Sequence, residues 1–89
     1  MIAQSRVTVG TTAVQLASAG LTPKNVTIKR VQNNAALFLG SSSVTTSNGL
    51  PFEGSEPLSF TLTAGDSLYA IADQELDDEV AVLTGTLLL

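Results

Sequence analysis

Short runs rich in Val, Leu, Ile and Thr recur along the chain, and Gly, Asn, Pro and Ser separate them. Their spacing of roughly 8 to 12 residues is typical of an all-β sandwich or barrel. The runs that we interpret as strands are Ala3–Val9, Ala13–Ala17, Asn25–Val31, Ala35–Leu39, Leu58–Leu62, Ser67–Ala72 and Val80–Thr84. The connections between them are too short for helical crossovers. The sequence therefore predicts a compact, antiparallel, all-β sandwich of seven or eight strands that resembles a jelly roll.

Alternation between apolar and polar residues assigns the faces of these strands. Val26 and Ile28 point inward in the third run, but Arg30 then takes an inward position and an apolar residue follows it on the outward side. A β-bulge near Lys29–Arg30, which shifts the phase by one residue, explains this change. The continuous apolar run Ala35–Leu39 indicates a central strand covered on both faces.

The chain is short enough to form one domain over residues 1–89, in which residues 85–89 are a candidate docking tail. Of its residues 44% are hydrophobic and 13% are charged, and the mean hydropathy is +0.32. A small domain exposes much of its surface, and few charges are present to cover it. We therefore expect a homo-oligomer whose subunit interface covers the excess apolar surface. No apolar run reaches the length of a membrane span, so we expect no contact with a membrane.

The charges are sorted along the chain. All four basic residues precede residue 50, and all eight acidic residues follow it. The two halves are therefore able to pair across a sheet or between subunits; the alternative is a chance distribution of twelve charges with one solvated acidic loop. The net charge of −4 and the isoelectric point near 4.3 argue against nucleic acid as a partner, because nucleic-acid binding needs a basic surface.

Catalytic chemistry has little support, because the chain holds neither histidine nor cysteine. The usual general base, nucleophile pairs and zinc ligands are thus missing, so we predict neither an enzyme nor a cofactor. The acidic loop 73–79 alternates carboxylates as a calcium loop does. Its sixth and twelfth positions are Asp78 and Thr84, where such a loop needs Gly and a bidentate Glu. We therefore predict a solvated hairpin loop and no metal, with a loose surface cation site as the alternative.

Several residues are candidates for contact with a partner protein. Leu50 and Phe52 lie in a neutral, hydroxyl-rich loop, where Phe52 either plugs one end of the sandwich or anchors a partner. Three leucines in the tail also suggest docking onto a neighbouring subunit, and two cations are placed to face an acidic strip. The complete set of predicted interface residues is Lys29, Arg30, Leu50, Phe52, Leu87, Leu88 and Leu89.

Part of the chain resembles a known family. The stretch "ALFLGSSSVTTSNGLPFEGSEPLSFTL", followed by "SLYAIA" and "VAVLTG", resembles small tailed-bacteriophage virion proteins and head-fibre domains. The resemblance implies a non-enzymatic virion structural protein, above all a capsid decoration (cement) protein. Such a protein is commonly trimeric, binds the major capsid protein or another virion protein, and stabilises the head. The alternative is a small fibre, tail or baseplate module that recognises a receptor or glycan.

Overall fold

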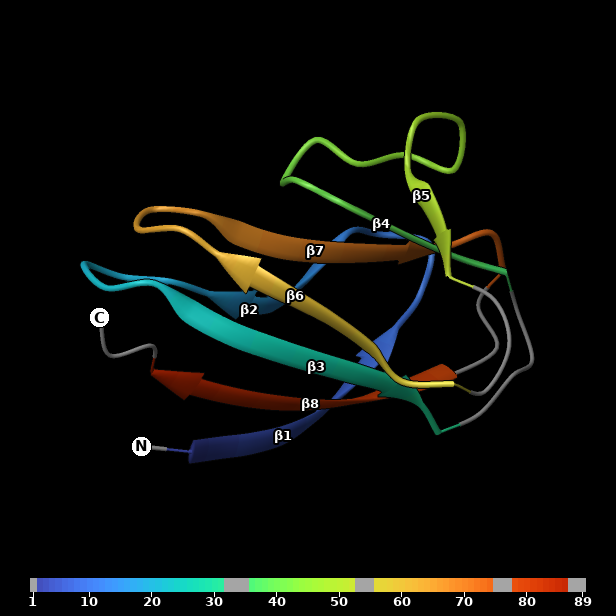
Figure 1. Ribbon diagram of the computed structural model, residues 1–89. Helices are drawn as coiled ribbons and strands as arrows, with labels where there is room; N and C mark the ends of the chain where they lie inside the picture. The colour runs from blue at the N-terminus through green and yellow to red at the C-terminus, as the bar shows by residue number, and fades with distance from the viewer. Residues whose placement is uncertain (1, 32–35, 53–55, 75–77, 87–89) are drawn as a thin grey trace.

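The computed structural model describes residues 2–31, 36–52, 56–74 and 78–86, which form two four-stranded antiparallel sheets (Figure 1). The strands are β1 (Ile2–Val9), β2 (Val14–Ser18), β3 (Lys24–Arg30), β4 (Leu37–Gly40), β5 (Leu50–Phe52), β6 (Leu58–Leu62), β7 (Ser67–Ala72) and β8 (Asp78–Thr86). No helix occurs in this part of the chain. The predicted all-β sandwich is confirmed, and all seven predicted runs are strands. The eighth strand, β5, lies in a stretch that we interpreted as a loop.

The strands follow the topology of a jelly roll. One sheet has the order β1-β8-β3-β6 and the other has the order β2-β7-β4-β5. Four antiparallel pairs are nested in one another: β1 with β8, β2 with β7, β3 with β6, and β4 with β5. Two further pairs, β3 with β8 and β4 with β7, join the nested pairs into complete sheets. This arrangement of eight strands is the double-sheet jelly roll.

An aliphatic core lies between the two sheets. Alternate residues of β3, β4, β7 and the first half of β8 are buried, because successive side chains of a strand point to opposite faces. The core residues with the least exposure are Val9, Ala19, Val26, Ile28, Leu37, Leu39, Phe52, Ala70, Ala72, Val80 and Val82. Each large side chain among them contributes about 1.5 to 3 kcal/mol through burial, so this layer is the main source of stability.

The predicted β-bulge near Lys29–Arg30 is wrong. The register between β3 and β8 runs without a break from Lys24 opposite Thr86 to Arg30 opposite Val80. Arg30 therefore keeps the inward phase of β3 and is buried. The register shift that does occur lies in β2, between Gln15 and Ala17.

The segment 41–49 folds back over the outer surface of β4, where Figure 1 shows it standing above the sheet. Val44 is its buried apolar residue. Gly49 packs so closely that an added Cβ atom would lie 2.6 Å from Cβ of Phe38 and 2.8 Å from Cγ2 of Val44. The backbone N–H of Thr45 donates to Oδ1 of Asn48 at 2.7 Å, and Oγ1 of Thr45 accepts from the N–H of Asn48 at 3.2 Å. The neutral loop is thus a packed and internally hydrogen-bonded cover of one sheet.

The acidic segment connects the two sheets. It leaves β7 in one sheet and enters β8 in the other, so it is not the hairpin loop that we predicted. Oδ1 of Asp73 accepts the backbone N–H of Ala36 at 3.1 Å. Asp78 is buried, and the residues between 74 and 78 lie outside the described part.

Candidate functional site

The β1-β8-β3-β6 sheet has one face against the core and one face that the described residues leave uncovered. We call the second face the outer sheet face. It follows from the register of the four strands and from the burial of their alternate residues. Its residues are Ile2, Gln4, Arg6 and Thr8 of β1, Asn25, Thr27 and Lys29 of β3, Ser59 and Thr61 of β6, and Glu79, Ala81, Leu83 and Gly85 of β8.

A leucine stands at the middle of this face. The cross-strand row that contains it runs from Gln4 through Leu83 and Thr27 to Ser59. Leu83 is 47% exposed, although β8 is an inner strand of its sheet. A shallow depression of about 470 Å³ lies beside it, and Gln4, Thr27 and Ala81 contribute to its lining. The small side chain of Ala81 makes this hollow, and Leu83 forms part of its apolar wall.

The polar residues over β3 and β6 already bond to one another. Oγ1 of Thr27 and Oγ of Ser59 lie 3.0 Å apart, and Oγ1 of Thr61 donates to Oδ1 of Asn25 at 3.2 Å. These cross-strand pairs fix the orientation of their side chains. These four residues therefore form a neutral, ordered part of the outer sheet face that is low in side-chain entropy.

Two cations flank an alanine in the next row. Arg6 and Lys29 are both opposite Ala81, on the two neighbours of β8. Because adjacent strands lie about 4.8 Å apart, their Cα atoms are separated by about 10 Å. Nη1 of Arg6 lies 3.6 Å from Oε1 of Glu79, and the two side chains are 62% and 31% exposed. Such a surface pair is weak, and Lys29 has no ion pair among the described residues. Both cations remain accessible to a partner.

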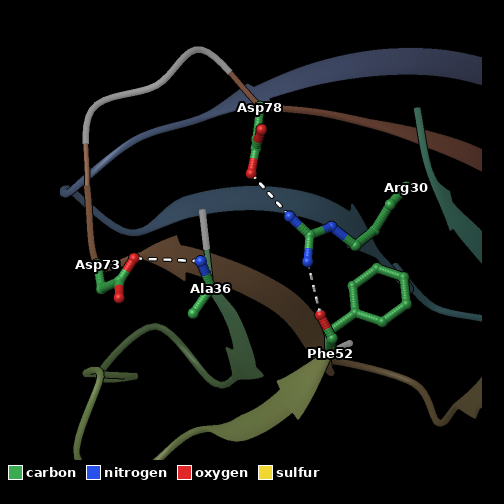
Figure 2. A network of polar contacts seen from close by, with 5 residues as sticks. All are labelled: Arg30, Ala36, Phe52, Asp73 and Asp78. Atoms are coloured by element: carbon green, nitrogen blue, oxygen red, sulfur yellow. Dashed lines mark hydrogen bonds and ion pairs between the residues drawn. The ribbon is translucent and has the colours of Figure 1, made fainter. Parts of the chain in front are cut away.

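The second ion pair is buried. Nη2 of Arg30 lies 2.7 Å from Oδ2 of Asp78, and their side chains are 2% and 1% exposed. Nη1 of Arg30 donates to the backbone carbonyl of Phe52 at 3.2 Å (Figure 2). Arg30 and Asp78 come from one sheet, and Phe52 comes from the other. The guanidinium therefore ties the two sheets together at one end of the sandwich.

The predicted interface residues do not form one surface. Lys29 lies on the outer sheet face, whereas Leu50 is 55% exposed on β5 of the other sheet. Arg30 and Phe52 come together, but inside the fold, and Phe52 is 2% exposed as the plug alternative requires. The three leucines 87–89 lie outside the described residues, while positions 85 and 86 of the expected tail belong to β8.

Sequence reasoning missed Leu83 and the buried partner of Arg30. Leu83 is an outward residue of β8, between the inward Val82 and Thr84. This alternation in the sequence could have indicated that Leu83 is exposed. Both ion pairs join a cation of the first half of the chain to an acid of the second half. Pairing across a sheet, one of the two arrangements that the sorted charges allow, therefore occurs in these two pairs.

Serine hydroxyls of segment 41–49 form hydrogen bonds within their own loop. Oγ of Ser41 lies 3.0 Å from Oγ of Ser43, and the N–H of Val44 donates to the carbonyl of Ser41. These bonds organise the loop itself. Across the described residues, no cluster of three metal-ligating side chains occurs, and no helix is long and apolar enough to cross a membrane.

Comparison with protein-family models, with curated proteins and with solved structures finds no match to this chain.

Proposed function

We propose that this protein is a non-enzymatic structural protein of a virion, and specifically a capsid decoration protein that binds the major capsid protein through its outer sheet face. The observation that carries the proposal is the exposed Leu83 at the centre of this face, in a cross-strand row whose other members, Gln4, Thr27 and Ser59, are uncharged. The resemblance to phage virion proteins, which covers mainly Val26–Leu83, supplies the class of partner.

The outer sheet face suits contact with a large, ordered protein surface. Its backbone is held by ladders on both sides of β8 and β3, so little conformational entropy is lost on binding. Leu83 supplies an apolar anchor beside the depression, and Lys29 supplies a cation for a carboxylate of the partner. Each contact is modest, and a homo-oligomer multiplies it by engaging several capsid subunits at once.

The alternative of a fibre or tail module that recognises a glycan fits the aromatic residues less well. Glycan sites commonly use an exposed aromatic ring as a stacking surface. Phe52 is in the core, and Tyr69 is half-buried with its hydroxyl donating to Oε1 of Gln15 at 3.4 Å. Neither ring lies on the outer sheet face.

Particle composition tests the proposal. Phage particles purified from cells that carry the encoding genome are analysed by quantitative mass spectrometry and cryo-electron microscopy. We expect hundreds of copies on the head surface. A few copies at the tail support the receptor-binding alternative, and particles without the chain contradict both functions.

Binding to heads assembled without this chain tests the surface. We expect Leu83→Asp to weaken binding by about tenfold or more, because it places a carboxylate in the apolar centre of the contact. Leu21→Asp is the matched control, since Leu21 is 98% exposed in the connection between β2 and β3 and belongs to no strand of this face. Circular dichroism verifies that both variants fold. Equal affinity of the two variants would show that the outer sheet face is not the contact.

A further inference from the structure

The strand β1 is an edge that the fold leaves unprotected. It pairs with β8 along Ile2–Val9, and its other side has no ladder partner among the described residues. Edge strands expose unpaired N–H and C=O groups, and proteins usually blunt them with charged side chains (above all lysine), proline, a bulge or an inward-pointing charge. β1 has no proline, lysine, bulge or inward-pointing charge. Its single charge, on Arg6, points outward and forms only the weak surface pair with Glu79.

The other three edges differ from β1. β2 is short and has a broken register at Gln15–Ala17. β5 spans Leu50–Phe52 and contains Pro51, and β6 is directly preceded by Pro57. The fold therefore blunts three of its edges and leaves the longest one open.

We propose that β1 pairs with β1 of a second copy of this chain, antiparallel and about a two-fold axis, so that two β1-β8-β3-β6 sheets join into one continuous sheet. We take the two-fold axis to be perpendicular to the sheet. Opposite residues of an antiparallel pair point to the same face, and side chains alternate between faces, so the axis must run between the two copies of one β1 residue. An axis at Arg6 sets two guanidinium groups directly opposite each other, which is destabilising. An axis at Gln4 shortens the paired segment to Ile2–Arg6.

The axis at Ser5 satisfies both requirements. It pairs Ile2–Thr8 of one copy with the same residues of the other and places Gln4 opposite Arg6 of the second copy. On the inner side, Ala3 is opposite Val7 of the second copy. The half-buried Val7 packs on the core, so this contact continues the apolar layer across the junction. The exposed Ile2 gains a neighbour in Thr8 of the second copy.

We choose a second copy of the chain as the partner of β1 because the β1 edge is self-complementary. An open ladder needs an extended backbone partner, and an antiparallel copy of β1 supplies donors and acceptors over the full paired length. Small side chains at Ala3 and Ser5 allow close approach, and no like charges meet in this register. The inference does not depend on the virion role. The family resemblance implies a trimer, whereas pairing at this edge gives a dimer. The number of subunits in the oligomer therefore distinguishes the two expectations.

Light scattering on the purified chain provides the first test. We expect a dimer at micromolar concentration. A monomer at these concentrations, or a trimer, would overturn the proposal. Either result would leave the assignment of the outer sheet face to the capsid intact, since that assignment is tested on heads.

Single cysteines provide the second test, because the chain has no cysteine of its own. Ser5 lies at the axis, so Ser5→Cys should form a covalent dimer when its two thiols are oxidised to a disulfide by oxidised glutathione. Thr8→Cys is the matched control, on the same strand and also exposed, and its two copies lie about 20 Å apart in this register. Cross-linking of Thr8→Cys instead of Ser5→Cys would refute the register.

A charge at the axis tests the interface without oxidation. Ser5→Glu sets two carboxylates opposite each other and should raise the dimer dissociation constant about fivefold, equivalent to ~1 kcal/mol. Thr61→Glu makes a similar change on the β6 edge and should leave the dissociation constant unchanged. Equal effects of the two variants would place the subunit contact elsewhere.

Discussion

The buried pair of Arg30 and Asp78 gives the sharpest stability prediction. Asp78→Asn keeps the shape of the side chain but removes the charge that lies 2.7 Å from Nη2 of Arg30. The guanidinium then remains buried without its carboxylate, and breaking a buried pair in this way costs about 3 to 5 kcal/mol. A domain of this length has a total stability of about 4 to 13 kcal/mol. We therefore expect a large fraction of the stability to be lost.

Urea denaturation followed by circular dichroism measures this effect. The midpoint should fall while the slope stays constant, because the surface exposed on unfolding is the same. Glu79→Gln is the matched control on the adjacent residue, since Glu79 belongs to the exposed pair with Arg6 and should cost less than about 1 kcal/mol. The double variant Arg30→Met with Asp78→Leu should recover most of the loss, because apolar replacements of a buried pair are often neutral or stabilising. A loss below about 1 kcal/mol for Asp78→Asn would refute this account of the pair.

Two further stability predictions concern the packed loop and the core. Gly49→Ala should lower the free energy of unfolding by about 1 to 3 kcal/mol, and the melting temperature with it, because the added Cβ would lie 2.6 Å from Cβ of Phe38. Gly20→Ala is the control and should lower the melting temperature little, because no atom lies within 4 Å of its added Cβ. Similar melting-temperature shifts for the two variants would contradict the packing of segment 41–49. Phe52→Ala should lower the free energy of unfolding, measured in urea, by about 3 to 5 kcal/mol because Phe52 is a core residue. Leu50→Ala should change it little, because Leu50 is exposed. A larger loss for Leu50→Ala than for Phe52→Ala would make Phe52 a surface anchor.

Strand positions were predictable because local patterns define them. Leu58–Leu62 and Ser67–Ala72 have the predicted bounds. Strict alternation specifies the first, and an apolar run after the TAGD turn specifies the second. β5 was missed because it is short and contains a proline, which usually marks a loop or an edge. Its position on the edge of the sheet is what allows Pro51 there.

The plain alternation of β3 places Arg30 inward, as the structure does, but the predicted bulge and interface role set this signal aside, and no pattern pointed to the partner of Arg30. An inward arginine in a small core requires a nearby carboxylate, yet eight acidic residues were available. Only the strand order brings Asp78 beside Arg30, and strand order depends on contacts between residues that are far apart in the chain. For the same reason, the outer sheet face could not be assembled from its separate strands. The alternation in β8 did, however, indicate that Leu83 points outward.

The place of β8 in its sheet also bears on synthesis. β8 follows the other seven strands in the sequence, yet it lies between β1 and β3 (Figure 1). On the ribosome, β1 and β3 therefore emerge well before the strand that joins them, and the sheet has a gap at its centre until β8 is made. Non-local pairing of this kind makes folding slow and leaves strand edges exposed to other chains. A nascent chain halted before residue 78 should therefore bind chaperones that recognise exposed apolar strands, and release should follow the addition of β8.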